Sequence, residues 1–431
     1  MQRFVIEGGH RLSGAVTVGG NKNEALPCLA ACLLTEEPVT LHRVPRIRDV
    51  EVMCEILADL GAEVRWLGEG SLQVVARGAL KRQLDPRLVR RIRASILLAG
   101  PMLARLGAVE LPLPGGDVIG RRRIDTHFNA LEAMGARVTV SSTSYDLSCD
   151  RCTLEEADVF FDEASVTATE NAVMAAALAR GVVILRNVAM EPHVQGLCRM
   201  LQAMGLSIAG IGTPTLTIQG ADRLRGCTHT VGPDYLEIGS FMGLAAVTGG
   251  DLRIGPVCQD DLRMIQLVFR RLGLESRLDG ETLHVPGDQE LVIRPDYHNH
   301  IPIVADATWP AFPTDLMSVA IAVATQAVGT VIFFEKMFEG RMFFVDHLIG
   351  MGARIILCDP HRVVVVGPSP LYGTRLESPD IRAGMAMLLA TCAARGQSTI
   401  DNIRQIDRGY ERVDEKLRQL GARIERVTIA E

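Results

Sequence analysis

Aromatic residues are scarce in this chain: they make up 4% of its 431 residues, whereas hydrophobic residues as a whole make up 48%. Any large core is therefore aliphatic and built mostly from Leu, Val, Ile, Ala and Met. Basic residues are not in surplus, since the net charge is −6 and the pI is near 6.0. General binding to nucleic acid or to an acidic membrane needs such a surplus. Arginine clusters in this chain are thus local and suit a small anion.

Long apolar runs and paired cysteines are also missing. The first ten residues hold no apolar core of signal-peptide length, and apolar runs such as residues 316–328 are interrupted by Ser and Gln. The ten cysteines stand mostly alone, with one CxxC at Cys149 and Cys152. This usage is typical of a reducing compartment. We expect a cytoplasmic protein without metal or cofactor, and the single CxxC leaves zinc or redox use as an alternative.

A short unit recurs along the chain. In each copy, two apolar positions three residues apart precede a glycine, and an alternating stretch follows, as in Leu131-Glu-Ala-Met-Gly-Ala-Arg-Val138. The pattern predicts a helix that ends in a left-handed glycine cap and leads into a strand. A fixed period indicates duplicated structural units. The six glycines, roughly 70 residues apart, are Gly61, Gly135, Gly205, Gly273, Gly352 and Gly421.

The six units divide naturally into two halves of three. A chain of 431 residues is too long for one ordinary core, and the midpoint falls near Val231-Gly-Pro-Asp234. Alternating helices and strands favour an α/β or α+β fold. We expect one domain from residues 22–231 and a second from residues 1–21 plus 232–431. An active site in the cleft between them would close by hinge motion.

The segment from Leu111 to His127 has the composition of a catalytic lid. Gly115 and Gly116 allow backbone angles that other residues avoid, and Asp117 follows them directly. Arg121, Arg122 and Arg123 offer planar guanidinium groups that suit phosphate oxygens. An acid between flexible points and beside a phosphate clamp predicts a mobile lid. The alternative is a surface turn with a solvated run of charges.

Two further segments are candidate anion sites. Gly19-Gly-Asn-Lys22-Asn23 precedes a helical run from Glu24, and glycines with a lysine before a helix start favour anion binding. Its spacing differs from that of a P-loop, and a polar turn is the alternative. Arg93 opens an apolar helix at Ile96–Leu103, which by itself is weak support for a site.

Two more segments present polar side chains at helix starts. Ser165-Val-Thr-Ala-Thr-Glu-Asn171 is rich in hydroxyl groups, and helix capping is sufficient to account for it. In Trp309-Pro-Ala-Phe-Pro-Thr-Asp315 two prolines set the approach to an apolar helix. Asp315 either caps that helix or acts as a general base, and the sequence leaves both open.

A last group of motifs is basic or rich in histidine. Phe338-Glu-Gly-Arg341, Asp380-Ile-Arg382 and Ile406-Asp407-Arg408 are the basic ones, and in the last two we expect the aspartate to orient the guanidinium; surface ion pairs are the alternative. Asp296-Tyr-His298-Asn-His300 looks like a metal-binding motif, but we favour a polar loop.

In combination the motifs are specific and resemble the family of UDP-N-acetylglucosamine 1-carboxyvinyltransferases. The similarity runs in order along essentially the whole chain. It implies an enolpyruvyl transferase fold: a two-domain inside-out α/β barrel in which each domain holds three βαβαββ units, six repeats in all. The motifs that carry it are Lys22-Asn23, Arg93-Ala-Ser-Ile, Pro114-Gly-Gly-x-x-Ile-Gly, Phe312-Pro-Thr-Asp315, Phe338-Glu-x-Arg341, Asp380-Ile-Arg382 and Ile406-Asp-Arg-Gly-Tyr-Glu411.

The resemblance implies an activity. The enolpyruvyl group of phosphoenolpyruvate moves to the 3′-hydroxyl of UDP-N-acetylglucosamine and phosphate leaves, which is the first committed step of peptidoglycan synthesis. The partners would be these two small molecules, with no nucleic acid or membrane, no metal, and a monomer or weak homo-oligomer. An enolpyruvyl transferase for a different nucleotide or nucleotide sugar, and a regulatory paralogue without turnover, are the alternatives.

The resemblance also implies roles for single residues. Asp117 stands where many relatives carry the lid cysteine that donates a proton, and Asp315 is the general-base candidate. With Lys22 and Arg408 these form the expected catalytic set. The expected substrate contacts are Lys22, Asn23, Arg93, Arg122, Arg123, Ile124, Asp125, Thr126, Ser165, Val166, Asp315, Met337, Arg341, Asp380, Arg382 and Arg408.

Some positions depart from the family pattern. Residues 122–126 read Arg-Arg-Ile-Asp-Thr where the family often has Arg-Pro-Val-Asp-Leu. Glu163 stands where a basic or small residue is common, Thr167 replaces a glycine, and residues 296–306 look like an insertion. A carboxylate at Glu163 would repel a diphosphate. The lid carboxylate further predicts insensitivity to fosfomycin, because it is a poorer nucleophile than a thiolate.

Overall fold

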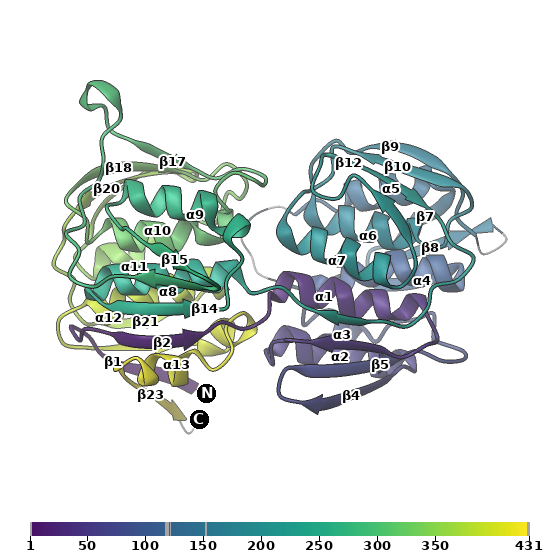
Figure 1. The fold of residues 1–431 in the computed structure, drawn as a ribbon, viewed down its shortest axis with the longest axis horizontal. Coiled ribbons are helices and arrows are strands. Elements are labelled where there is room, and N and C mark those ends of the chain that lie inside the picture. Colours follow the sequence, from purple (N-terminus) through teal and green to yellow (C-terminus); the bar gives the residue numbers. More distant parts are fainter. Residues whose placement is uncertain (1, 117–119, 121, 151–152, 429–431) are drawn as a thin grey trace. The chain divides into compact units, whose positions relative to one another are not determined.

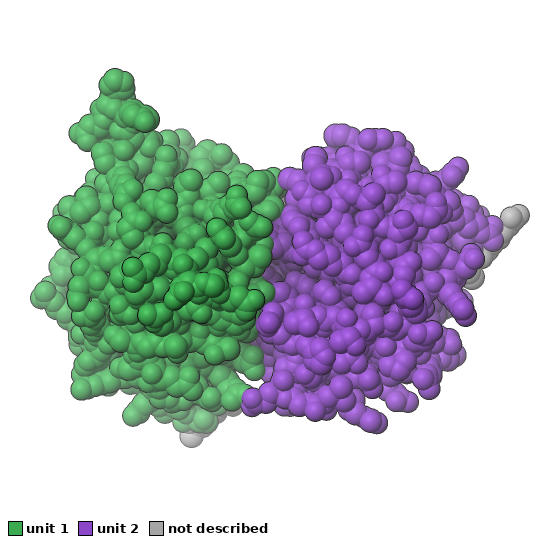
Figure 2. Space-filling view, viewed as in Figure 1, with its two compact units in different colours: residues 1–19, 118–121, 233–431 green, residues 20–117, 122–232 purple. Residues whose placement is uncertain are grey.

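The computed structural model describes residues 2–116, 120, 122–150 and 153–428. The chain divides into two compact units. Unit 1 comprises residues 1–19, 118–121 and 233–431, and unit 2 comprises residues 20–117 and 122–232 (Figure 2). None of the helices in the described part is long and apolar enough to cross a bilayer.

Unit 2 alternates helices and strands along the chain (Figure 1). Its helices are α1 (Lys22–Ala31), η1 (Cys32–Leu34), α2 (Arg48–Leu60), α3 (Pro86–Val89), η2 (Arg93–Leu98), α4 (Ala99–Leu106), α5 (Asp125–Ala133), α6 (Val166–Ala176) and α7 (Pro192–Ala203). Its strands are β3 (Val39–His42), β4 (Glu63–Gly68), β5 (Ser71–Val75), β6 (Ala108–Pro112), β7 (Ala136–Val140), β8 (Ser144–Cys149), β9 (Ala157–Phe160), β10 (Val182–Arg186), β11 (Ser207–Ala209), β12 (Thr215–Gln219) and β13 (Thr228–Thr230).

Unit 1 combines the first two strands with the second half of the chain. Its helices are α8 (Tyr235–Thr248), α9 (Gln259–Arg271), η4 (Tyr297–Asn299), η5 (Thr314–Leu316), α10 (Met317–Ala324), α11 (Val345–Gly350), α12 (Ile381–Ala393), η6 (Ile403–Arg408) and α13 (Val413–Gln419). Its strands are β1 (Gln2–Glu7), β2 (Ser13–Thr17), β14 (Asp251–Gly255), β15 (Arg277–Asp279), β16 (Thr282–Val285), β17 (Ile303–Ala305), β18 (Gly329–Phe334), β19 (Arg354–Asp359), β20 (Arg362–Gly367), β21 (Arg375–Glu377), β22 (Gln397–Asp401) and β23 (Arg423–Thr428).

The sheets repeat one topology. Within the described ranges each unit holds three sheets, with orders β13-β3-β5-β4, β6-β8-β7 and β11-β12-β10-β9 in unit 2, and β15-β16-β14-β2, β17-β18-β20-β19 and β21-β22-β1-β23 in unit 1. Each four-stranded sheet has one parallel pair at an edge and two antiparallel pairs, as in β17 beside β18 and β18 beside β20. Five sheets of this kind and the three-stranded antiparallel sheet β6-β8-β7 agree with the predicted six repeats, and the enolpyruvyl transferase fold is confirmed.

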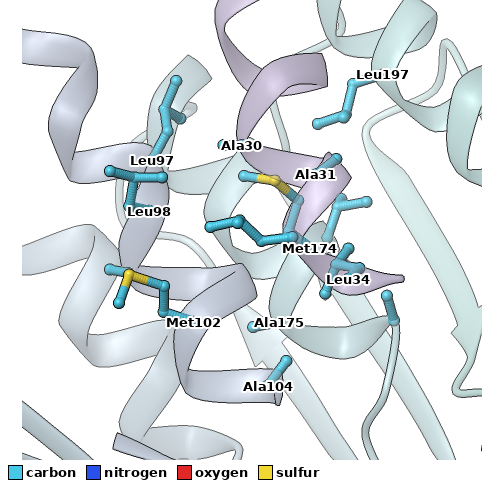
Figure 3. Close-up of a cluster of buried hydrophobic side chains, with 14 of the residues drawn as sticks. Ala30, Ala31, Leu34, Leu97, Leu98, Met102, Ala104, Met174, Ala175 and Leu197 are labelled. Carbon is cyan, nitrogen blue, oxygen red and sulfur yellow. The ribbon is translucent and has the colours of Figure 1, made fainter. Parts of the chain in front are cut away.

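Helices fill the inside of each unit and sheets cover them, which is the inside-out arrangement. In unit 1 the helices α8, α10 and α12 pack against one another and are buried nearly throughout. Glycines permit the close approach: a Cβ on Gly239 would lie 2.6 Å from a methyl carbon of Leu316, and one on Gly243 would lie 2.7 Å from Val319. In unit 2, side chains such as Ala30, Met174 and others from α1, η2, α4 and α6 form an aliphatic core (Figure 3).

The repeat glycines end their helices as predicted. All six have positive φ angles, between 92° and 109°, in the region where residues with a Cβ are strained. Gly61, for example, is the C-cap of α2 and its N–H donates to Ala58 O. The glycine-capped helix that leads into a strand is therefore confirmed at each copy.

Three element boundaries differ from the sequence-based expectations. Helix α1 begins at Lys22 and not at Glu24, because the Asn21 side chain accepts a hydrogen bond from Asn23 N and caps the helix there. The expected helix at Ile96–Leu103 begins as the 3₁₀ segment η2 and continues as α4. Of the apparent insertion at residues 296–306, the three residues of β17 are an integral edge strand of a sheet.

Candidate functional site

The first anion-binding candidate sits at the start of α1 in unit 2. Lys22 is the first residue of this helix, and its Nζ lies 2.8 Å from Oδ2 of Asp49. Both side chains are nearly buried, so the ion pair holds the ammonium in one place. Asn23 follows on the same first turn and is half-buried. The pair therefore fixes the position of the predicted cation before any ligand arrives.

The Pro-Gly-Gly segment lies against Arg90, at the end of α3, and Arg93, the first residue of η2. A Cβ on Gly115 would lie 1.8 Å from Arg90 O, and one on Gly116 would lie 2.7 Å from the Cβ of Arg93. These glycines are thus required for close packing, a role in addition to the predicted hinge. Arg93 Nη2 donates to Arg122 O over 3.2 Å. Asp117, the predicted acid of the lid, lies outside the described residues.

Arg123 is surrounded by carboxylates of unit 2. Its Nη2 lies 2.6 Å from Asp162, its Nε 3.4 Å from Asp125 and its Nη1 3.7 Å from Glu163. The hydrogen bond with Asp162 raises the pKa of Arg123 and lowers the pKa of Asp162. Thr126 donates to the other oxygen of Asp162 over 3.1 Å. The unusual Glu163 therefore has a guanidinium nearby, which it shares with Asp125 and Asp162.

The start of α6 lies beside a buried polar network. Ser165 is the N-cap and accepts a hydrogen bond from Ala168 N, as the capping interpretation predicts, and Val166 is the first helical residue. The network itself was not predicted. In it, Thr167 Oγ1 lies 3.0 Å from Nε2 of His127, and Asn171 Nδ2 lies 2.8 Å from Nδ1 of the same ring.

The His127 ring in this network is neutral at physiological pH. Burial, with the nearby Arg93 charge, lowers the pKa of His127 to about 3. The ring therefore serves as a fixed hydrogen-bonding group beside the predicted contacts Thr126 and Ser165.

In unit 1, Asp315 is held between two arginines that come from distant parts of the chain. Arg341 Nη2 donates to Oδ1 over 3.0 Å, and Arg382 Nη2 donates to Oδ2 over 2.9 Å. Both arginine side chains are 6% exposed, and the aspartate is 24% exposed. The N-cap residue of α10 is Leu316, which makes no side-chain cap bond. The two bonds from arginine favour the general-base interpretation of Asp315 over the capping one.

Arg382, the second arginine of this group, is also hydrogen-bonded to Tyr410. Arg382 Nη1 donates to Tyr410 OH over 3.2 Å, and that hydroxyl lies 2.9 Å from Oγ of Ser240. Both are buried. The N-cap of α8, Asp234, lies near the Arg382 charge, and burial raises the pKa of Asp234 to about 6. Ser240 and Asp234 were not predicted, because only the fold brings α8 beside α12.

The predicted orientation of guanidinium groups by neighbouring aspartates is wrong. Asp380 caps α12 and accepts from the backbone N–H of Arg382 and of Ala383. Asp407 accepts two hydrogen bonds of 2.8 Å from Arg426. Adjacent residues point in different directions at a helix start or in a 3₁₀ turn, so sequence neighbours are not partners here.

Two other predicted contacts of unit 1 lie at the ends of short segments. Met337 is 39% exposed and follows β18. Arg408 is the last residue of η6, and its Nη1 donates to Gln405 Oε1 over 2.9 Å. Both side chains are thus at least partly open to a ligand.

One group of described side chains could hold a metal ion, and it was not predicted. Glu24, Cys28 and His229 place one ligand atom each within 4.8 Å of one another. Glu24 is already bonded, however, to His229 over 2.8 Å and to Gly232 N over 3.1 Å. The protein's own donors thus satisfy this carboxylate.

The two motifs that suggested metal binding from sequence do not form such a group in the described part of the chain. Residues 297–299 form the exposed turn η4, and the neighbouring Asp296 pairs with Arg271 over 3.1 Å, which agrees with the polar-loop interpretation. In the CxxC, Cys149 is buried, and Cys152 lies outside the described residues.

The fold of this chain is that of enolpyruvyl transferases. The solved enolpyruvyl transferase NikO from Streptomyces tendae aligns with 100% of this chain and 99% of its own length at a TM-score of 0.87 and 24% identity. The EPSP synthase of Acinetobacter baumannii aligns with a TM-score of 0.76 at 19% identity, over 99% of this chain and 100% of its own. These likenesses define the fold class.

Sequence comparison narrows this class. The family model of EPSP synthase (3-phosphoshikimate 1-carboxyvinyltransferase) matches residues 6–417. The UDP-N-acetylglucosamine 1-carboxyvinyltransferase of Bradyrhizobium diazoefficiens is 56% identical over 99% of this chain and 98% of its own length. The protein of the same name from Treponema denticola is 52% identical over 99% of both chains. The chain belongs to the UDP-N-acetylglucosamine 1-carboxyvinyltransferase family, and the prediction of this transferase family is confirmed.

Proposed function

We propose that the protein transfers the enolpyruvyl group of phosphoenolpyruvate to the 3′-hydroxyl of UDP-N-acetylglucosamine with release of phosphate, the first committed step of peptidoglycan synthesis. The observation that carries this proposal is the 56% identity over 99% of the chain to a relative named for this reaction. An acceptor other than UDP-N-acetylglucosamine is the second candidate, since residues 122–126 depart from the common family pattern.

The chemistry requires one acid, one base and several cations. Protonation of C3 of phosphoenolpyruvate makes C2 electrophilic, the sugar hydroxyl attacks C2 as it loses its proton, and a tetrahedral ketal forms. The C3 proton is then lost as phosphate leaves and the vinyl bond is restored. Positioned acids and bases accelerate such proton transfers about 10²–10⁴-fold. No step of this sequence needs a metal or a redox cofactor.

Asp315 is suited to the role of base because its carboxylate is already oriented. Each oxygen accepts from one guanidinium, with Arg341 on one side and Arg382 on the other. A carboxylate oxygen can accept more than one hydrogen bond, so Asp315 can also accept from a sugar hydroxyl. We assign the acid to Asp117. Closure over the substrate would desolvate this carboxyl group and raise its pKa, and the neighbouring arginines act in the opposite direction.

Cations on both units would bind the anionic reactants. Lys22, Arg122 and Arg408 are proposed as ligands of phosphoenolpyruvate, with Arg341 and Arg382 as further cationic groups. Asn23, Arg93, the stretch Arg123 to Thr126, Ser165 and Val166 are proposed contacts of the nucleotide sugar, together with Met337 and Asp380. Because each set includes residues of both units, the proposed reaction requires both units to act on the same pair of substrates.

The proposed location rests on the cysteine usage, and the proposed assembly rests on the family resemblance. We propose that the enzyme works in the cytoplasm, as a monomer or a weak homo-oligomer, on these two small molecules.

Phosphate release from phosphoenolpyruvate tests the function directly. We expect release that depends on UDP-N-acetylglucosamine, with a product that carries the enolpyruvyl ether at the 3′ position. The same assay with a panel of other nucleotide sugars is the comparison. Release with another acceptor, but none with UDP-N-acetylglucosamine, would favour the second candidate. If no acceptor in the panel supports phosphate release, but calorimetry shows that the nucleotide sugar binds, the result would favour a protein that binds without turnover.

A further inference from the structure

Two buried carboxyl groups lie side by side in unit 1, close to the proposed base. Asp306 follows β17 and Glu335 follows β18, and these strands are parallel with Ala305 opposite Phe334. The register therefore places the next residue of each strand beside the other. Asp306 and Glu335 are both 0% exposed. Two charged carboxylates without water between them would repel each other strongly.

Glu335 organises the segment that leads to Arg341. Its carboxyl group accepts from Met337 N and from Phe338 N, each over 3.1 Å. The ring of Phe338 in turn lies 5.2 Å below the guanidinium of Arg341. Arg341 Nε is 3.8 Å from Glu335 Oε2. The carboxyl group thus folds the turn that presents both Met337 and Arg341.

The same carboxyl group also holds the residue before the proposed base. Thr314 Oγ1 donates to Glu335, at 3.0 Å from one oxygen and 2.9 Å from the other. Thr314 directly precedes Asp315 in η5. Glu335 is therefore linked to both members of the Asp315–Arg341 ion pair. It holds Asp315 through Thr314 and Arg341 through the turn at residues 337–341.

Asp306 lacks a donor on one side. Its Oδ1 accepts from Lys336 N over 2.6 Å. Its Oδ2 is buried, and no N–H or O–H donor of the described residues bonds to it. The Glu335 carboxyl is its side-chain neighbour, and a carboxylate pair has no hydrogen to share unless one member is protonated. A single proton between the two groups satisfies Oδ2.

We propose that Asp306 and Glu335 form a carboxyl pair that shares one proton, and that this pair is a positioning device for Asp315 and Arg341. The geometric support is the strand register, the complete burial, the donor-less Oδ2 of Asp306 and the bonds from Glu335 to Thr314, Met337 and Phe338. The importance of the pair for turnover rests on the proposed function, whereas the shared proton does not.

The charges around the pair agree with one proton. Arg341 is the cation near Glu335, and it also serves Asp315. His361 lies against the pair, but its Nδ1 is bonded to the backbone oxygen of Glu335, and Lys336 approaches Asp306 through its backbone N–H. One negative charge on the pair is therefore compensated, and a second is not. Burial, followed by the bond with Asp306, raises the pKa of Glu335 to about 8.

The pair makes stability depend on pH with a definite sign. A carboxyl group with a raised pKa in the folded state holds a proton that the unfolded chain has already lost. Between the ordinary pKa of glutamate, about 4.5, and the folded value of about 8, unfolding releases this proton. The contribution of the pair is fully present below that window and decreases as pH rises through it. Above pH 8 the second charge should loosen the turn at residues 336–341.

The main test is the variant Asp306→Asn. The amide has the shape of the carboxyl group and donates a permanent N–H to Glu335, so the pair no longer needs a proton. We expect the loss of thermal stability of the parent between pH 6 and 9 to be much smaller in the variant. We also expect the parent KM for phosphoenolpyruvate to rise above pH 8 with kcat less affected, and this rise to disappear in Asp306→Asn. The matched control is Asp346→Asn, an exposed aspartate of α11, which should keep the parent profiles.

A spectroscopic measurement keeps the proposal falsifiable if the variant folds poorly. The protonated carboxyl gives an infrared C=O band that is distinct from the carboxylate bands. In the parent this band should lose intensity as pH rises through about 8, and Glu335→Gln should remove the titrating component. Glu335→Gln replaces one acceptor oxygen by an NH₂ group, which faces the donors Thr314, Met337 and Phe338. Buried hydrogen bonds are then left unmade, so kcat/KM should fall about 10–100-fold.

The outcomes separate this inference from the proposed function. Identical stability profiles of the parent and Asp306→Asn, or a parent spectrum without a C=O band that titrates near pH 8, would overturn the pair. Those measurements need no substrate, so they can support the pair even if no acceptor is turned over. Turnover with UDP-N-acetylglucosamine combined with an unchanged profile in Asp306→Asn would keep the function and remove the pair.

Discussion

The two units hold their charged residues in different ways. In unit 2, Arg123 is 38% exposed and faces carboxylates that are about half exposed. In unit 1, Asp315 is gripped by two arginines that are each 6% exposed and are themselves supported by Tyr410 and Phe338. Exposed ion pairs contribute little and exchange partners easily, whereas removing one member of a buried pair is costly. The ion pairs around Arg123 can therefore rearrange easily, whereas the ion pairs around Asp315 are fixed before any ligand binds.

The largest effect is expected at the lid. Asp117→Asn keeps the size of the side chain but removes the proton, so kcat should fall by about 10²–10⁴-fold, the typical contribution of a general acid. Affinity for UDP-N-acetylglucosamine, measured by calorimetry, should stay close to that of the parent. Full turnover in this variant would remove Asp117 from the mechanism.

A comparably large effect is expected for the base. Asp315→Ala removes the proposed base and leaves Arg341 and Arg382 facing each other without their shared partner. We expect kcat to fall by about 10²–10⁴-fold and the unfolding temperature to decrease as well, because two buried cations lose compensation. Asp346→Ala is the control for loss of a charge in the same unit. A variant that retains parent kcat would show that another group takes the proton.

An intermediate effect is expected from the support behind the base. Tyr410→Phe removes the hydroxyl that accepts from Arg382 and contacts Ser240. The loss of about 1–2 kcal/mol for a buried hydrogen bond corresponds to a decrease in kcat/KM of roughly 5–30-fold. Steady-state kinetics with both substrates provide the measurement. An unchanged kcat/KM would contradict the view that unit 1 depends on buried preorganisation.

A smaller effect, dependent on salt, is expected in unit 2. Arg123→Ala should weaken binding of UDP-N-acetylglucosamine by only a few-fold, about 1 kcal/mol or less, because the arginine must leave Asp162 before it contacts a diphosphate. The difference from the parent should shrink as ionic strength rises from about 0.05 to 0.5 M, because the Debye length then falls from about 14 Å to about 4 Å. If Arg123→Ala weakened binding by about 10²-fold or more, the expected difference between the Arg123 and Asp315 ion pairs would be contradicted.

No effect at all is expected from fosfomycin. The carboxylate at Asp117 is a poorer nucleophile than a thiolate toward the epoxide, so preincubation should leave the activity unchanged. Asp117→Cys supplies the thiol, and this variant should become inactivated with time. A covalent adduct at residue 117 in the parent, seen by mass spectrometry, would contradict the prediction.

The repeat and the glycine caps were predictable because they depend on local geometry. A helix followed by a left-handed glycine and an alternating strand is specified within about ten residues, as at Gly135 and Gly352, where φ is 92° and 108°. The fold class was then indicated by two features: the division of the six units into two halves of three, and the resemblance of the motifs to a known family.

The partners of the candidate residues were not predictable in the same way. Proximity in sequence suggested that Asp407 would orient Arg408, yet it binds Arg426. Gly115 and Gly116 looked like hinge residues, and the fold also uses them to bring the backbone close to Arg90. These contacts depend on side-chain directions across elements that are far apart in the chain.

The sequence by itself determined the six repeated units, their aliphatic cores and the family, because periodicity, composition and motif spacing are local properties of the chain. The tertiary structure alone decided that Asp315 is shared by Arg341 and Arg382, that His127 is buried and neutral, and that Asp306 lies against Glu335. Each of these depends on strand register and helix packing that join segments far apart in the chain. Burial, and with it the charge state of a side chain, exists only after those segments have come together.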